Sequence, residues 1–348
     1  MTKLLHPGTL PLVPKPRYTQ IDIEATPYYH CISRCVRRAF LCGADRLTER
    51  NFDHRKAWVV EKLASLSAIF AVRICAYGVL SNHFHLVVRI HSECARAWGA
   101  AEVVERYGRL FPATAKRWAK LSRRRQADRV RCWRARLADL SWFMRCLNES
   151  IARRANAEDQ CTGRFWEGRF RSQALLDEAG LLTCMSYVDL NPMRAGIAQS
   201  LESSDFTSIQ QRLFEYAREQ DAAAAPDPGS TSDGDGDCVR PRLVGFSGAE
   251  PGEEALPVDF ASYVELLAAT GAALYAPEPT PRLPEDVRCT LERVGVRSGR
   301  WLEAVRDYRK RFFSMIGCVH RIEVYCARTD RDRAKGSRWA AQVFRDCA

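Results

Sequence analysis

Residues 71–90, AVRICAYGVLSNHFHLVVRI, contain two apolar stretches on either side of a short polar corner. The stretches 71–80 and 83–90 are rich in β-branched and aliphatic residues, and only Ser81 and Asn82 separate them. This pattern predicts two β-strands that flank a tight turn. The chain is therefore expected to contain an antiparallel hairpin with His83, Phe84 and His85 at the start of its second strand.

The segments around this hairpin predict further strands and helices. Residues 28–36, YYHCISRCV, carry β-prone side chains at alternating positions and predict another strand. Apolar residues recur at helical spacing in 54–68, and a long helix is predicted over 137–155. Residues 163–176, GRFWEGRFRSQALL, predict a short hairpin or loop. The pattern turns helical again from residue 178, and this helix is expected to end near Asn191 because Pro192 follows.

The net charge of the chain points to an acidic partner. Its 348 residues carry a formal net charge of +11 with a pI of about 9.1, and 46% are hydrophobic, which suits a protein that buries a core. Nucleic acid is the commonest partner of so basic a protein, although a generally basic surface is the alternative. No apolar run approaches the roughly 18–20 residues that span a bilayer, so we expect no membrane association.

The N-terminus and the cysteines indicate a cytoplasmic protein. Prolines interrupt the short apolar stretch in MTKLLHPGTLPLVPKPRYTQ, which does not resemble a signal peptide. The 14 cysteines are scattered and form no C-x-x-C pair, so a structural zinc site is not supported. We expect them to be reduced residues in a cytoplasmic chain.

Charge is concentrated in a helical stretch over about 98–136. Between Lys116 and Arg136 the sequence has ten lysines and arginines, among them Arg123, Arg124 and Arg125, and a single acid, Asp128. These cations repel one another, which favours an anionic partner over a merely solvated helical face.

Composition divides the rest of the chain. Residues 220–257 include DAAAAPDPGSTSDGDGD and predict a flexible acidic linker. Helical periodicity returns over 258–348 and predicts a small helical C-terminal domain. Its segment 283–313 predicts two helices with many arginines on the second. They form either a DNA-reading pair of the helix-turn-helix kind or a pair that packs on the rest of the protein or dimerises.

Two histidines form the first candidate site. Alternate residues of a strand point to the same face, so His83 and His85 can reach one divalent ion while Phe84 packs into the core. Such a pair taken alone is more often an exposed pair without a ligand. Asn191 can supply a third ligand, and histidine and amide ligands suit Mg²⁺ or Mn²⁺.

Tyr187 is the candidate nucleophile. It precedes Asn191 by four residues and is therefore expected one turn away on the same face of a helix. A cation that neutralises a phosphate near Asn191 would allow the phenol to attack phosphorus and form a 5′-phosphotyrosine. The alternative is an ordinary buried aromatic residue of the helix.

Four segments together resemble a known family. They are YYHCISRCVRRAFLCG (28–43), the strand pair with His83-Phe84-His85, GRFWEGRF (163–170) and YVDLNPMRAG (187–196). In this order they resemble the REP-associated tyrosine transposases, single-tyrosine members of the HUH endonucleases, in which two histidines flank a hydrophobic residue. The resemblance covers roughly residues 18–214.

The resemblance implies a fold and an activity. The fold would be α+β: a ferredoxin-like antiparallel sheet with helices (the HUH endonuclease fold) in a catalytic domain over 1–219, here with a basic insertion and an extra C-terminal domain. Tyr187 matches the nucleophile, His83 and His85 match metal ligands, and Asn191 matches the third ligand. The substrate would be single-stranded or hairpin DNA from palindromic repeats, and relatives act as monomers or homodimers.

Several arginines outside the basic stretch are candidate DNA contacts. Those of the first strand could line a DNA channel or cap a strand end, and those of 163–171 could hold phosphates while neighbouring aromatic residues close the core or stack on bases. The candidates are Arg34, Arg37, Arg38, Arg164, Arg169, Arg171 and Arg194.

Three functions compete on the sequence alone. The first is an active transposase that cuts and rejoins single-stranded DNA. The second is a domesticated DNA-binding regulator without catalysis. The third is a replication initiator or relaxase-like nickase that shares the histidine pair, although Asn191-Pro192-Met193-Arg194 favours the transposase branch.

Overall fold

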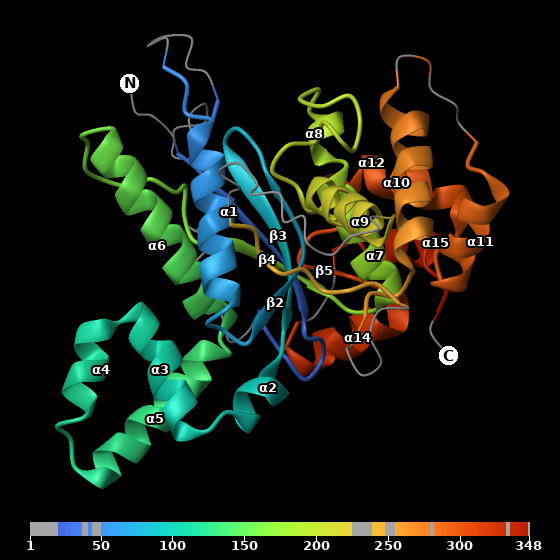
Figure 1. Cartoon of the computed structure of the whole chain (residues 1–348). Helices are drawn as coiled ribbons and strands as arrows, with labels where there is room; N and C mark the ends of the chain where they lie inside the picture. Colours follow the sequence, from blue (N-terminus) through green and yellow to red (C-terminus); the bar gives the residue numbers. More distant parts are fainter. Residues whose placement is uncertain are drawn as a thin grey trace, which may run out of the picture.

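In a computed structural model the chain is described over residues 20–36, 41–43, 50–224, 239–247, 255–276, 278, 282–331 and 335–346. These residues form an α+β fold, as predicted, in which helices cover both faces of a mainly antiparallel sheet (Figure 1). No helix among the described residues combines the length and the apolar character needed to cross a membrane.

The described part of the sheet has five strands in the order β2-β3-β1-β4-β5. They are β1 (Tyr28–Arg34), β2 (Val72–Val79), β3 (His83–Ile90), β4 (Arg171–Leu175) and β5 (Met315–Ile316). The neighbouring strands are antiparallel except β4 and β5, which are parallel. The hairpin and the first strand occur where they were predicted, whereas β4 lies at the end of a segment predicted as a hairpin or loop.

The register of β1 determines which side chains meet. Ile32 lies opposite His85 on β3 and Arg171 on β4, and His30 lies opposite Gln173 on β4. Because successive side chains of a strand alternate between faces, all of these residues share one face of the sheet. One face of the sheet therefore carries polar residues at the end where β3 begins.

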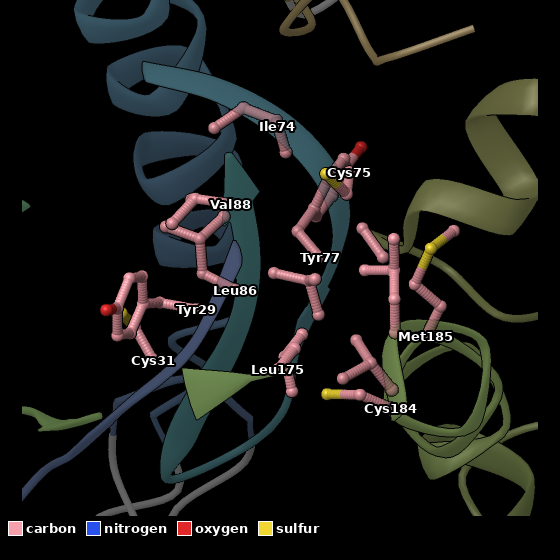
Figure 2. Close-up of a cluster of buried hydrophobic side chains, with 14 of the residues drawn as sticks. Tyr29, Cys31, Ile74, Cys75, Tyr77, Leu86, Val88, Leu175, Cys184 and Met185 are labelled. Atoms are coloured by element: carbon pink, nitrogen blue, oxygen red, sulfur yellow. The ribbon is translucent and has the colours of Figure 1, made fainter. Parts of the chain in front are cut away.

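The opposite face is covered by α1 (His54–Ser67) and α6 (Leu140–Glu158), which pack against each other (Figure 1). The buried guanidinium of Arg55 ties the two helices together through ion pairs with Glu158, at 2.6 Å, and with Asp159. Figure 2 shows Tyr29 and Cys31 on the side of the sheet that α1 and α6 cover. It shows Cys184 on the opposite side.

The face of the sheet that carries His30, His85 and Gln173 is covered by α7 (Glu178–Asp189). Helices α9 (Ser208–Ala224) and α10 (Phe260–Tyr275) lie beside α7 (Figure 1). Every residue of α7 after Glu178 is buried, because the sheet covers one side of the helix and other helices cover the rest. An all-round apolar helix of this kind belongs to the core of a protein.

The basic stretch forms a helical arm, residues 92–137, that stands away from the sheet (lower left in Figure 1). It contains α2 (Ser92–Ala97), α3 (Ala100–Leu110), α4 (Pro112–Trp118) and α5 (Arg123–Leu137). Tyr107 and Trp133 stack at its centre, with ring centroids 4.4 Å apart. The predicted helical character is confirmed, as a bundle of short helices.

Part of the C-terminal segment packs against the face of the sheet that carries α7. Its strand β5 pairs with β4, and α12 (Trp301–Arg306) contacts α7. Its other helices are α11 (Glu285–Arg293), α13 (Tyr308–Arg311), α14 (Val319–Arg328), α15 (Ser337–Val343) and the 3-10 helix Ser298–Arg300. The segment that the sequence predicted as a helical domain thus also contributes a strand to the common sheet.

The predicted flexible linker over 220–257 is corrected in part. Helix α9 continues to Ala224, and the backbone N–H of Val244 donates to the carbonyl of Ile74 at 2.8 Å. Val244 and Phe246 are buried, so this part of the stretch packs against the rest of the protein, whereas Val239 is 70% exposed. Residues 225–238 and 248–254 lie outside the described residues.

A buried carboxylate, Asp189, joins α7 to α9 and α10. It accepts hydrogen bonds from the hydroxyls of Ser208 (2.5 Å) and Tyr263 (2.6 Å) and from the backbone N–H of Ile209 (3.1 Å). Burial raises the pKa of Asp189, and the hydrogen bonds and the nearby Arg212 oppose that rise. The three donors make burial of this group tolerable.

Replacing Tyr263 by Phe removes one of these donors without changing the packing. We expect the free energy of unfolding to fall by about 1.5–3 kcal/mol, the usual contribution of a hydrogen bond to a charged group. Urea unfolding would measure the change. The matched substitution Tyr216→Phe, at a half-exposed tyrosine, should change stability by less than about 0.5 kcal/mol. Equal effects of the two substitutions would contradict this role of Asp189.

Candidate functional site

The structure brings the four predicted site residues together. His83 and His85 begin β3, Tyr187 lies in the last turn of α7, and Asn191 begins α8 (Asn191–Arg194). The ring centroids of the two histidines are 4.9 Å apart, and those of His85 and Tyr187 are 5.5 Å apart. Asn191 Nδ2 lies 3.1 Å from His85 Nε2. Residues that lie about one hundred positions apart in the sequence are thus in contact in the structure.

The helix that carries Tyr187 differs from the prediction in one detail. It ends at Asp189, and Asn191 begins a separate short helix after Leu190, so the two residues do not share one continuous helix. The predicted end near Asn191 is confirmed. The backbone N–H of Leu190 still donates to Ser186 O, and that of Arg194 to Leu190 O, both at 3.0 Å, which keeps the connection tight.

A chain of buried hydrogen bonds orients His85. An amide oxygen can only accept, so Gln173 Oε1 accepts from His30 Nδ1 at 3.1 Å. It also accepts from the hydroxyl of Tyr308 at 2.5 Å. A neutral His30 then carries its lone pair on Nε2, which accepts from His85 Nδ1 at 2.9 Å.

This assignment leaves Nε2 of His85 without a proton and facing Asn191. Burial lowers the pKa of His30 to about 4 and lowers the pKa of His85 well below its ordinary value, which keeps both rings neutral near pH 7. A hydrogen-bonded partner on the far nitrogen is the usual way in which a protein fixes the tautomer of a metal-binding histidine.

His83 presents a second unprotonated nitrogen. Its Nδ1 lies 2.6 Å from the amide oxygen of Asn82, so Nδ1 carries the proton. Its Nε2 is buried and makes no hydrogen bond with the described residues. Burial, together with Arg34, Arg309 and Arg194, lowers the pKa of His83 to about 3. A buried lone pair without a donor is what a metal ligand presents before the ion binds.

The donor set fits a divalent ion held by nitrogen and amide ligands. Both Nε2 atoms are unprotonated, and Asn191 places an amide beside them. The described residues contain no group of three or more His, Cys, Asp and Glu side chains that could hold a metal ion, and the candidate third ligand beside the two histidines is the amide of Asn191. Such a site leaves further coordination positions for a substrate oxygen.

Tyr187 is nearly inaccessible in this structure. It is 1% exposed, and its hydroxyl makes no hydrogen bond with the described residues. Its ring stacks on Tyr308 with centroids 4.4 Å apart, and the guanidinium of Arg194 lies 5.4 Å from its ring centroid. Burial raises the pKa of Tyr187, and Arg194 and Arg309 oppose this rise. The hydroxyl is therefore covered from solvent in this structure.

The predicted DNA-contacting arginines separate into groups. Arg34, Arg169 and Arg171 line one hollow beside the site, and Arg194 donates to Asn191 Oδ1 at 3.3 Å. Arg164 is exposed on the loop before β4. Arg123, Arg124 and Arg125 are exposed at the start of α5 in the helical arm, and Arg37 and Arg38 lie outside the described residues.

The aromatic residues of the 163–171 loop belong to the core. Phe165, Trp166 and Phe170 are buried, and the indole N–H of Trp166 donates to Asn148 O at 2.8 Å. Of the two roles predicted for these rings, core packing is the one that the structure shows.

Four residues of the site were missed by the sequence reasoning: His30, Gln173, Tyr308 and Arg309. His30 lies in a strand that was predicted, and strand alternation could have placed it on the same face as Arg34. Gln173 and Tyr308 carried no local signal, because their roles depend on pairings between residues far apart in the chain.

Comparison with known proteins gives little similarity. No family model matches the chain, and no curated protein matches it. A solved structure described as a REP-associated tyrosine transposase bound to a REP hairpin aligns with 63% of this chain and 93% of its own, at 12% identity and a TM-score of 0.33. An alignment at this level establishes neither the fold nor the function.

The tautomers can be observed directly. In protein with ¹⁵N-labelled histidine, we expect His30, His83 and His85 to carry their proton on Nδ1 near pH 7 and His30 and His83 to stay neutral to about pH 5, since both have pKa values below that. The unfolded chain, with histidine pKa values near 6.5, takes up protons first, so stability should fall as the pH drops below about 6.5. Loss of single signals in His83→Gln and His85→Gln would assign the resonances. An Nε2-protonated His85 would contradict the hydrogen-bond chain.

Proposed function

We propose that this protein is a transposase-type nuclease and strand-transferase that cleaves single-stranded, hairpin-forming DNA through attack by Tyr187. The observation that carries the proposal is the convergence of Tyr187, His83, His85 and Asn191, from distant parts of the chain, on one buried patch. The matching segments of sequence add the substrate class, DNA from palindromic repeats.

The topology supports the same proposal. Strands β1 to β4 with α1 between β1 and β2 form a split β-α-β arrangement in the order β2-β3-β1-β4, which is that of a ferredoxin-like sheet. The histidine pair lies on a central strand of this sheet, as the HUH interpretation requires, and the tyrosine lies on the helix that covers it.

His83 Nε2, His85 Nε2 and the amide of Asn191 would hold Mg²⁺ or Mn²⁺. When bound, the ion would neutralise phosphate charge and act as a Lewis acid. In this structure Asn191 directs its Nδ2 at His85 Nε2, so ligation through oxygen requires the amide to turn. Because each histidine carries its proton on Nδ1, its Nε2 is unprotonated and has a lone pair for the metal ion.

The reaction is an exchange of phosphate esters. Tyr187 loses its phenolic proton to solvent, and its oxygen forms a bond to phosphorus while the bond from phosphorus to the 3′ oxygen breaks. The 3′ oxygen takes up a proton, which leaves a free 3′-hydroxyl and a 5′-phosphotyrosine. Burial raises the pKa of Tyr187 and disfavours the phenolate, and the positive charges of Arg194 and Arg309 oppose that rise. Attack of a 3′-hydroxyl on the phosphotyrosine rejoins DNA and frees the tyrosine.

Covalent trapping tests the nucleophile. Full-length protein incubated with Mn²⁺ and end-labelled single-stranded DNA carrying hairpins from the flanks of its own gene should give a band that resists denaturation. Tyr187→Phe should abolish this band, because it removes the attacking oxygen, while Tyr216→Phe at an exposed tyrosine should retain it. A band that persists in Tyr187→Phe would assign the chemistry to another residue.

Metal binding tests the histidine pair separately from cleavage. Titration of the protein with Mn²⁺, followed by electron paramagnetic resonance, should give one bound ion. His83→Gln and His85→Gln should each weaken this binding by at least about tenfold, a loss that even second-shell changes produce. His320→Gln, at an exposed position of α14, serves as the control. Unchanged Mn²⁺ affinity in both site variants would contradict a metal site here.

One observation favours a second function. Tyr187 is buried beneath Tyr308 and does not reach the surface, as expected of a DNA-binding regulator that retains the fold without catalysis. DNA binding without any covalent product, across several metals and substrates, would select this alternative.

A further inference from the structure

Two hollows adjoin the candidate site and together form one cleft. The larger has a volume of about 560 Å³ and the smaller about 290 Å³, and both are lined by Ile32, Arg169, Arg171 and Arg309. The strands β1 and β4 and the loop before β4 form one wall, and residues 308–314 of the C-terminal segment form the other. We call this feature the β4–α13 cleft.

The cleft has an excess of positive charge. Arg34, Arg169, Arg171 and Arg309 line it, and Glu167 is the one carboxylate in its described lining. Among the described residues, Arg34, Arg171 and Arg309 form no ion pair. Many arginines elsewhere do: the guanidiniums of Arg131 and Arg300 lie 2.6 and 3.2 Å from carboxylates. Four arginines gathered around a concave surface with a single carboxylate are typical of a phosphate-binding site.

The same cleft offers an aromatic surface. Phe170, Tyr308 and Phe312 line it and are buried, whereas Phe313 is 51% exposed at its edge. An exposed phenyl ring beside arginines is the combination with which proteins hold single-stranded nucleic acid, through stacking on bases and contacts with phosphates. Stacking of this kind requires a base that is not already stacked in a duplex.

The larger hollow adjoins residues that contact the proposed nucleophile and His85. Its inner end is lined by His30, Gln173 and Tyr308, and the ring of Tyr308 stacks on Tyr187. Arg309 lies on the wall of this hollow, and its positive charge opposes the rise in the pKa of Tyr187 that burial causes. A strand that lies in the cleft would therefore be separated from Tyr187 by the ring of Tyr308.

We propose that the β4–α13 cleft binds the unpaired DNA nucleotides that flank the cleaved phosphate. Phosphates contact Arg34, Arg171 and Arg309, and one base stacks on Phe313. The C-terminal segment is thus part of the substrate site. Only the statement that these nucleotides flank the cleaved phosphate rests on the proposed function; the binding itself does not require Tyr187 chemistry.

The test is a fluorescence-anisotropy titration in the absence of metal. It measures the affinity of the full-length protein for a fluorescently labelled single-stranded DNA of about ten nucleotides. Phe313→Ala should weaken binding by about five- to 100-fold, the usual effect of losing one stacked base. Arg309→Gln should reduce the salt dependence of log K by about 0.7, the slope of one phosphate contact on a single strand. Both side chains are exposed, so the variants should fold, and thermal unfolding would verify this.

Matched substitutions outside the cleft serve as controls. Arg321→Gln on α14 and Phe214→Ala on α9 remove an exposed arginine and a half-exposed phenylalanine, and both should bind as the unchanged protein does. A 2-aminopurine base in the bound strand should be quenched in the unchanged protein and not in Phe313→Ala.

The outcomes separate the two proposals. Unchanged affinity and salt dependence in Phe313→Ala and Arg309→Gln would overturn the cleft proposal, whatever the covalent assay gives. Tighter binding of duplex DNA or of RNA than of single-stranded DNA would also overturn it. If the cleft variants lose binding while no covalent product forms with any metal, the cleft assignment stands and the nuclease proposal fails.

Discussion

The pairing of β1 with strands on both of its sides is the constraint on which the site depends. β1 is antiparallel to β3 and to β4, and its register sets His30 beside Gln173 on one side and Ile32 beside His85 on the other. A shift of one residue would turn each of these side chains to the opposite face of the sheet. Tyr29 and Cys31, on that opposite face, are fully buried, so burial of the core fixes the register that assembles the site.

Burial of α7 is the second determinant, and it has a functional consequence. The helix lies between the sheet and the C-terminal helices, and Asp189 at its end binds donors from α9 and α10. This arrangement holds Tyr187 firmly beside His85, but it also covers the phenol. The stacked ring of Tyr308 belongs to the part of the chain that the sequence had set apart as a separate domain. That segment thus completes the hydrogen-bond chain behind His85 and forms one wall of the arginine cleft.

Positive charge is gathered in two places that lie far apart. One is the β4–α13 cleft, and the other is the helical arm, where Lys116, Lys120 and Arg123 to Arg125 are exposed. The arm follows the end of β3, whereas the histidines begin that strand, so the length of β3, eight residues or roughly 25 Å, separates them. The two regions would contact different parts of a bound nucleic acid, one at the site of chemistry and one at a distance.

The sequence by itself determined the elements whose signals are local. Alternation and a two-residue corner indicated the hairpin of β2 and β3, and Pro192 indicated where α7 ends. The spacing of His83 and His85 on a strand and of Tyr187 and Asn191 near a helix end identified the four residues that meet. Only the tertiary structure decided what surrounds them. Gln173 and Tyr308 act on His85 through contacts between residues 30, 85, 173 and 308, and no local periodicity encodes such contacts. The same holds for the burial of Tyr187, which results from packing of a segment that follows more than one hundred residues later.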